Sequence, residues 1–191
     1  GAACGLGNRL LALVFLPAMG LARAVNTVVG QTLGAEKPAR AWRAVRAALG
    51  VVTAVMLPVA LATAAFPEPI VQVFLPPGSP DAGETIAYAS AYLRVATVMF
   101  VFLGIFEISR GAFRGAGRTG TALALSRVAV WLVRVPVTYV AVFVYDFGTA
   151  GIWWAVVAGD VVGALVGLAW LLHGTWMRSV VEPPSGVPAD D

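Results

Sequence analysis

Five long apolar stretches dominate the sequence, at about residues 10–34, 47–66, 92–112, 122–145 and 151–172. A helix needs about 20 largely apolar residues to cross the hydrocarbon core of a bilayer. Membrane β-strands are only about 10 residues long and alternate apolar with polar positions, whereas these runs are continuous. The sequence therefore predicts an all-α, polytopic transmembrane helical bundle with five spans over residues 1–178.

The composition points to lipid as the main solvent of the side chains. Hydrophobic residues make up 59% of the chain and charged residues only 12%, whereas a soluble domain carries about 25% charged residues. The net charge is +3, and the basic residues sit in short loops and at helix ends. We therefore expect a lipid bilayer as partner and no nucleic acid. With one cysteine, Cys4, the chain can form no intrachain disulfide.

No catalytic or metal-binding motif is present in the sequence. It contains no glycine-rich phosphate loop with lysine, no set of nucleophile and base, and no cluster of cysteine and histidine. We therefore expect no enzyme activity, no metal and no organic cofactor. Transport by such a chain would have to draw its energy from an ion gradient or from a partner.

The charges of the loops predict the orientation in the membrane. Two of the four loops are basic, and their bases are Lys37, Arg40, Arg43, Arg46, Arg110, Arg114 and Arg118. The other two loops carry only acids, namely Glu68, Asp81, Glu84 and Asp146. Basic loops face the cytoplasm, so we predict a multi-pass protein of the cell (plasma) membrane with its N-terminus outside and its C-terminus in the cytoplasm.

Three further segments have predicted roles. Residues 67–75 in the second loop are mildly apolar and are expected to form a short helix along the outer interface. The proline-rich residues 179–191 are expected to form a disordered cytoplasmic tail. The chain begins without methionine, and its N-terminus is predicted outside the cell although no signal sequence is visible. We therefore expect an N-terminal portion upstream of Gly1.

Four ionisable residues lie deep within the spans: Arg23, Glu107, Arg134 and Asp160. Each costs about 2.5 to 3.5 kcal/mol or more in the membrane unless it is paired or hydrated. At about 1.5 Å of rise per residue, Arg23 and Glu107 lie about 20 and 22 Å from the outer helix ends. Arg134 and Asp160 lie about 16 and 14 Å deep on the same scale, on neighbouring antiparallel spans. These depths suggest two ion pairs, Arg23–Glu107 and Arg134–Asp160.

Each of these residues also has a purely structural interpretation. Arg134 and Asp160 are either a structural clamp or part of a transport site. Glu107 either pairs with Arg110 one turn away or serves as a carboxylate that couples transport to a cation. Asp160 is a coupling candidate for the same reason. A tight pair with an arginine would make proton carriage by either acid less favourable.

Other polar and aromatic residues are candidates for a substrate cleft. Asn26 and Gln31 lie in the inner half of the first span and either line a cavity or form hydrogen bonds between helices. Trp131 either stacks on an organic cation or packs in the core.

Small residues and prolines shape the predicted helices. Pro17, Pro58 and Pro136 fall inside spans and are expected to kink them. In the fifth span the small residues recur every fourth position, which permits close helix approach; they are Ala155, Gly159, Gly163 and Gly167.

Several motifs resemble those of the multidrug and toxin extrusion (MATE) family. Residues 26–35, Asn-Thr-Val-Val-Gly-Gln-Thr-Leu-Gly-Ala, resemble the end of the second helix of a MATE half, which opens into a basic loop. Residues 92–95, Tyr-Leu-Arg-Val, resemble the start of a later helix. Residues 110–119 resemble the Arg-Gly-x-Gly-x-Thr turn between the family's fourth and fifth helices.

The resemblance implies a twelve-helix fold of two six-helix bundles, of which this chain would supply helices eight to twelve. It implies export of amphipathic, often cationic, small molecules in exchange for H⁺ or Na⁺, together with a missing N-terminal half. Glu107 would lie in the family's tenth helix, where acids can serve cation coupling. An arginine such as Arg23 is not expected in the wide drug-binding cleft of this family unless it pairs with an acid.

Two alternatives remain at this point. A lipid-linked oligosaccharide flippase of the same superfamily would have a cleft rich in arginine, which Arg23, Arg127 and Arg134 could supply. A membrane subunit that does not itself transport is the other.

Overall fold

The computed structural model describes residues 2–74 and 82–177. Within these ranges every regular element is helical, which confirms the all-α prediction. The first four elements are α1 (Ala2–Gly34), α2 (Pro38–Ala65), α3 (Pro67–Phe74) and α4 (Ala82–Gly115). A fourth long helical segment follows, composed of α5 (Thr119–Arg127), η1 (Val128–Arg134), α6 (Val135–Tyr139) and η2 (Val140–Val144). The last elements are α7 (Gly148–His173) and the 3-10 turn η3 (Thr175–Met177).

Four helical segments among the described residues are long and apolar enough to span a membrane: Pro38–Ala65, Gly83–Gly115, Thr119–Val144 and Gly148–His173. Each overlaps one of the predicted spans over all but at most one residue. The first predicted span lies inside α1, which is a continuous helix of 33 residues. That α1 crosses the membrane stays a prediction.

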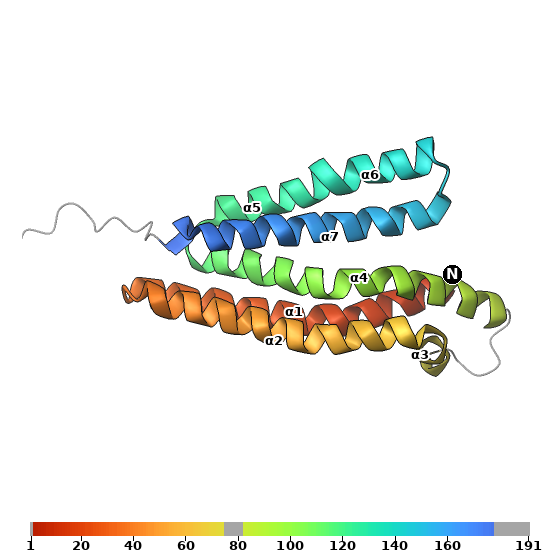
Figure 1. Cartoon of the computed structure of the whole chain (residues 1–191), viewed down its shortest axis with the longest axis horizontal. Coiled ribbons are helices and arrows are strands. Elements are labelled where there is room, and N and C mark those ends of the chain that lie inside the picture. Colours follow the sequence, from red (N-terminus) through yellow and green to blue (C-terminus); the bar gives the residue numbers. More distant parts are fainter. Residues whose placement is uncertain (1, 75–81, 178–191) are drawn as a thin grey trace, which may run out of the picture.

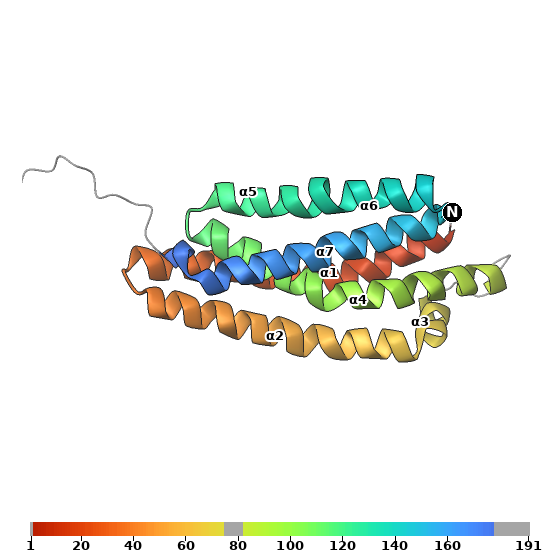
Figure 2. The ribbon, with the colours of Figure 1, turned by 45° about the horizontal axis from the view of Figure 1, so that its top comes forward.

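The long helices run roughly parallel to one axis, and α4 is their hub (Figure 1). α4 packs against α1 and α2 on one side and against α5 and α7 on the other. The fourth segment packs chiefly against α7 along its length. Figure 2 shows α2 and the α5–α6 segment at opposite sides of the bundle, with α1, α4 and α7 between them.

Glycine permits the closest contact in the bundle, between α1 and α4. A Cβ atom at Gly111 would lie 2.4 Å from the carbonyl oxygen of Ala22, and one at Gly115 would lie 2.4 Å from that of Asn26. Because real Cβ atoms do not approach a backbone oxygen so closely, both positions require glycine for this packing.

The stripe of small residues on α7 also serves close packing, as predicted. An added Cβ at Gly163 would lie 2.7 Å from the Phe106 ring, and one at Gly167 would lie 2.9 Å from the Cβ of Ser109. Both contacts are with α4, so these two glycines let α7 pack closely against α4.

The fourth segment contains two π-helical stretches on either side of Pro136. The Val135 N–H donates to the carbonyl of Val130, and the Tyr145 N–H donates to that of Val140, both with the i→i−5 spacing of a π-helix. Proline has no N–H to donate to the residue four positions earlier, which weakens the α-helical ladder around it. The π-helical winding on both sides of Pro136 was not predicted, and the kink expected at this proline stays a prediction.

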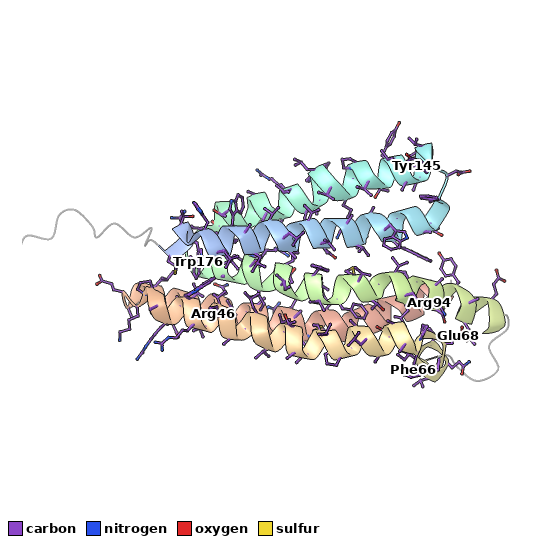
Figure 3. The ribbon with its side chains drawn as sticks, in the orientation of Figure 1. Arg46, Phe66, Glu68, Arg94, Tyr145 and Trp176 are labelled. Carbon is purple, nitrogen blue, oxygen red and sulfur yellow. The ribbon has the colours of Figure 1, made fainter. Side chains whose placement is uncertain are left out.

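The two ends of the bundle are built differently (Figure 3). At one end α3 forms a short helix where residues 67–75 were expected to do so, and Glu68 forms an exposed ion pair with Arg94 at 3.9 Å. At the other end Trp176 is buried and its Nε1–H donates to the carbonyl of Leu171 at 3.0 Å. The predicted tail, residues 179–191, lies outside the described residues.

Candidate functional site

A cavity of about 480 Å³ lies between α1, α4, α7 and the α5–η1 part of the fourth segment. Most of its wall is apolar, and the apolar side chains include Phe15, Met99, Leu103 and Phe106. Its charged lining comprises two carboxylates and two guanidinium groups, those of Glu107, Asp160, Arg110 and Arg134. The cavity thus combines an apolar surface with four charges inside a membrane bundle.

The Arg134–Asp160 pair predicted from matching depth is present. Nη2 of Arg134 donates to Oδ1 of Asp160 at 3.2 Å, which joins η1 to the middle of α7. The Asp160 side chain is only 6% exposed, whereas that of Arg134 is 34% exposed. A buried carboxylate needs such a partner because desolvation of an unpaired charge is very costly.

A close approach by Gly159 makes this pair possible. A Cβ at Gly159 would lie 2.9 Å from the carbonyl oxygen of Ala129 and 3.4 Å from both Cβ and Nε of Arg134. The Arg134 side chain therefore lies directly over the bare backbone of α7 on its way to Asp160. The ion pair thus depends on the absence of a side chain at Gly159.

Glu107 pairs within its own helix. Nη1 of Arg110 donates to Oε1 of Glu107, one turn away on α4. The guanidinium of Arg110 also lies 5.4 Å from the centre of the Phe106 ring, within the range of a cation–π contact. The side chain of Glu107 is 8% exposed, so this pair too is largely shielded from water.

The expected Arg23–Glu107 pair is not among the ion pairs of the described side chains. Glu107 takes the local partner Arg110 instead, while the Arg23 side chain is exposed on α1. A match in depth does not fix the direction in which a side chain points around the helix axis. The pairing with Arg110, which the i,i+3 spacing offered as the alternative, is the correct one.

The remaining cleft candidates do not line this cavity. Asn26 is half-buried at the contact between α1 and α4, and Gln31 is exposed. Trp131 is 68% exposed, so the expectation that it packs in the core of this chain is wrong. It lies in η1, whose π-helical winding separates its direction from that of Arg134 more widely than an α-helix would.

Sequence reasoning missed Arg110 as a cavity residue and missed the contribution of Phe15 from α1. The i,i+3 spacing of Glu107 and Arg110 was the only available signal for the first, and nothing in the sequence marks the second. Across residues 2–74 and 82–177, no group of three or more His, Cys, Asp and Glu side chains is placed to hold a metal ion.

Known proteins resemble the chain in sequence. The family model for MatE matches residues 2–140. The probable multidrug resistance protein NorM of Pseudomonas aeruginosa is 32% identical over 154 residues, which cover 81% of this chain and 31% of that protein. The protein of the same description from Deinococcus radiodurans is 33% identical over 145 residues, covering 76% of this chain and 32% of that protein.

A third relative, the probable NorM of Thermotoga maritima, is 25% identical over 176 residues, covering 92% of this chain and 37% of that protein. The chain thus spans less than two fifths of the length of these relatives.

Solved transporters share the fold. A MOP superfamily transporter from Pyrococcus furiosus aligns with a TM-score of 0.81 at 22% identity, and the alignment covers 93% of this chain and 39% of that transporter. An inward-facing multidrug resistance MATE family transporter aligns with a TM-score of 0.77 at 22% identity, covering 92% and 40%. The eukaryotic MATE transporter AtDTX14 gives 0.78 at 18% identity, covering 93% and 38%.

These likenesses agree with the helical architecture and with the motifs of the sequence. The relatives are described as multidrug resistance proteins and as MATE family transporters. The family match covers most of the chain, from α1 into the start of η2. This chain is a membrane protein that belongs to the MatE family.

Proposed function

We propose that the chain supplies the second bundle of a secondary active antiporter that exports amphipathic or cationic organic compounds in exchange for H⁺ or Na⁺. Relatives described as multidrug resistance proteins support the substrate class. Their greater length supports a first bundle contributed by an N-terminal half of the same protein. We further propose the plasma membrane, with the α1–α2 and α4–α5 turns in the cytoplasm.

The cavity beside Asp160 is the observation that carries this proposal. Transporters place substrate and coupling-ion sites near the middle of the bilayer, at the interface between repeats. Asp160 lies near the middle of α7, and the cavity beside it has apolar walls. An amphipathic cation could place its apolar part against Phe106 and Met99 and its charge toward a carboxylate.

The two ion pairs in the cavity differ in how they respond to movement between helices. Glu107 and Arg110 belong to one helix, so a rigid-body movement of that helix leaves their separation unchanged. Arg134 and Asp160 belong to different helices, so their separation changes when η1 moves relative to α7. A cation that takes the place of Arg134 on Asp160 would release this link between helices. Asp160 is therefore the coupling acid we favour, and Glu107 is the second candidate.

The other cleft candidates lie outside the cavity, so a substrate would have to reach them on the surface of this chain. Gln31 and Trp131 are exposed on this chain, and Arg23 is exposed as well. Their proposed role in a substrate cleft therefore requires that a first bundle faces them. Asn26, which is half-buried between α1 and α4, is the weakest of these candidates.

Transport by the full-length protein in proteoliposomes tests the proposal. A proton gradient or a sodium gradient would be imposed separately, and movement of ethidium, an amphipathic cation, would be followed by fluorescence. We expect one of the two gradients to drive transport that vesicles without protein do not show. Glu107→Gln and Asp160→Asn should reduce it, whereas Glu68→Gln, which alters an exposed pair far from the cavity, should not. Absence of transport under both gradients would count against an antiporter of organic cations.

A lipid-linked oligosaccharide flippase is the second candidate, because the cavity contains the guanidinium groups of Arg110 and Arg134. Of the three arginines that the sequence suggested for such a cleft, only Arg134 lines the cavity, while Arg23 and Arg127 are exposed. Replacing each of the three by alanine discriminates between the functions. Loss of glycolipid transport with drug efflux intact would favour the flippase.

A further inference from the structure

A second cavity, of about 360 Å³, lies at the end of the bundle where α4 turns into α5 and where α7 ends. Its polar lining comes from Arg118, Gly120 and Thr121 at the start of α5, and its aromatic wall from Trp170 and Trp176. None of these residues lines the cavity that contains Asp160. The two cavities are therefore separate sites.

The polar side of this second cavity is rich in hydrogen-bond donors that have no acceptor. The half-buried Arg118 precedes α5, and its Nε is buried without a hydrogen-bond partner among the described residues. Its side chain does not cap α5. The N–H groups of Gly120 and Thr121 belong to the first turn of α5, where a helix offers them no internal acceptor. A guanidinium group beside free N–H groups favours an anion such as a phosphate group.

The surface around the cavity is basic and lacks ion pairs. The α1–α2 turn, the first part of α2 and the last turn of α4 also carry bases at this end, namely Lys37, Arg40, Arg43, Arg46 and Arg114. None of these five bases takes part in the ion pairs that the described side chains form. Arg46 and Trp176 lie at this same end in Figure 3. Such a surface attracts the anionic lipids of the cytoplasmic leaflet, at about 1 kcal/mol per base.

The aromatic wall indicates that the anion carries an apolar part. Trp170 is 38% exposed near the end of α7, and the ring of Trp176 lies 6.1 Å from that of Trp42 of α2, tilted by 53°. Tryptophan is typical of the headgroup level of a membrane, where one side of the ring meets acyl chains. A free phosphate ion would gain nothing from this wall.

We infer that this cavity binds the phosphate group of an anionic phospholipid, with Arg118 and the first turn of α5 as its ligands. The inference uses the cytoplasmic placement of this end from the proposed function. It does not depend on which compound is transported, and its test measures binding alone.

Native mass spectrometry of the full-length protein in detergent tests the inference, with phosphatidylglycerol and phosphatidylcholine as the lipids added. Arg118→Gln should weaken phosphatidylglycerol binding at least about tenfold, because it removes a charge-assisted phosphate ligand. Arg114→Gln is the matched control, since it removes the same charge from an exposed position four residues earlier, in the last turn of α4. Its effect should stay below about fivefold, the effect of one base near an anionic surface.

A second variant keeps the charge and fills the cavity. Ala124 lines the cavity and lies within α5, so Ala124→Leu should also displace the lipid without altering any base. Equal effects of Arg118→Gln and Arg114→Gln, or unchanged binding in Ala124→Leu, would overturn the inference. Displacement of the lipid by millimolar inorganic phosphate would assign the cavity to a soluble anion instead.

Discussion

Arg134 and Asp160 join two neighbouring membrane helices through a hydrogen-bonded ion pair of 3.2 Å. The pair lies beside the larger cavity, and Gly159 provides the space that the arginine side chain crosses. The same two residues are thus part of the packing of α7 and of the proposed coupling site. Their contributions to stability and to transport can be separated by experiment.

Removing only the arginine should destabilise the protein. Arg134→Met leaves the carboxylate of Asp160 buried without its partner, and breaking a buried pair in this way costs about 3–5 kcal/mol. Because a third of the Arg134 side chain is exposed, we expect the lower end of this range. The double variant Arg134→Met with Asp160→Leu should recover most of the loss. Unfolding of the purified variants in detergent would measure both effects, and equal stability of the two variants would contradict the assignment.

Gly159→Ala should loosen the fourth segment from α7. The new methyl group would meet the carbonyl of Ala129 at 2.9 Å and crowd Arg134, so the helices must separate. Overpacking of this kind costs about 1–3 kcal/mol. Gly50→Ala in α2 is the control, because nothing lies within 4 Å of its added Cβ. The melting temperature should fall for the first variant and stay level or rise for the second, and a fall of similar size in both would contradict this reading.

The sequence was sufficient for much of this architecture because a bilayer imposes simple rules. Continuous apolar runs predicted the long helices, and matching depth on a short hairpin predicted the Arg134–Asp160 pair. The repeat of small residues on α7 predicted its close packing. Each of these features depends on distance along a helix, which the sequence states directly.

Features that depend on direction around a helix could not be predicted in the same way. Depth alone suggested Arg23 as the partner of Glu107, but the two side chains do not pair. Core packing was one of the two interpretations of Trp131, but the residue lies in the π-helical η1 and is exposed. No residue pattern announced that winding, and the cavity itself arises from packing among α1, α4, α5, η1 and α7.

The orientation of the bundle can be tested by labelling cysteines in intact cells. In a Cys4→Ser background, Glu68→Cys would place a thiol at the end of the bundle that carries α3. Lys37→Cys would place one at the opposite end, in the turn between α1 and α2. A reagent that cannot cross the membrane should label the cysteine at position 68 in intact cells and the one at position 37 only after the cells are opened. The Cys4→Ser protein without added cysteines is the control. The reverse labelling pattern would show that the basic turns face outward.

The most direct test of the coupling site compares two transport modes of Asp160→Asn in proteoliposomes. Counterflow exchanges labelled for unlabelled substrate without a gradient, whereas net efflux requires the cation gradient. If the Arg134–Asp160 pair links cation binding to helix movement, Asp160→Asn keeps counterflow but gains nothing from an imposed gradient. Efflux that the gradient still accelerates as strongly as in the unmodified protein would contradict a coupling role for Asp160.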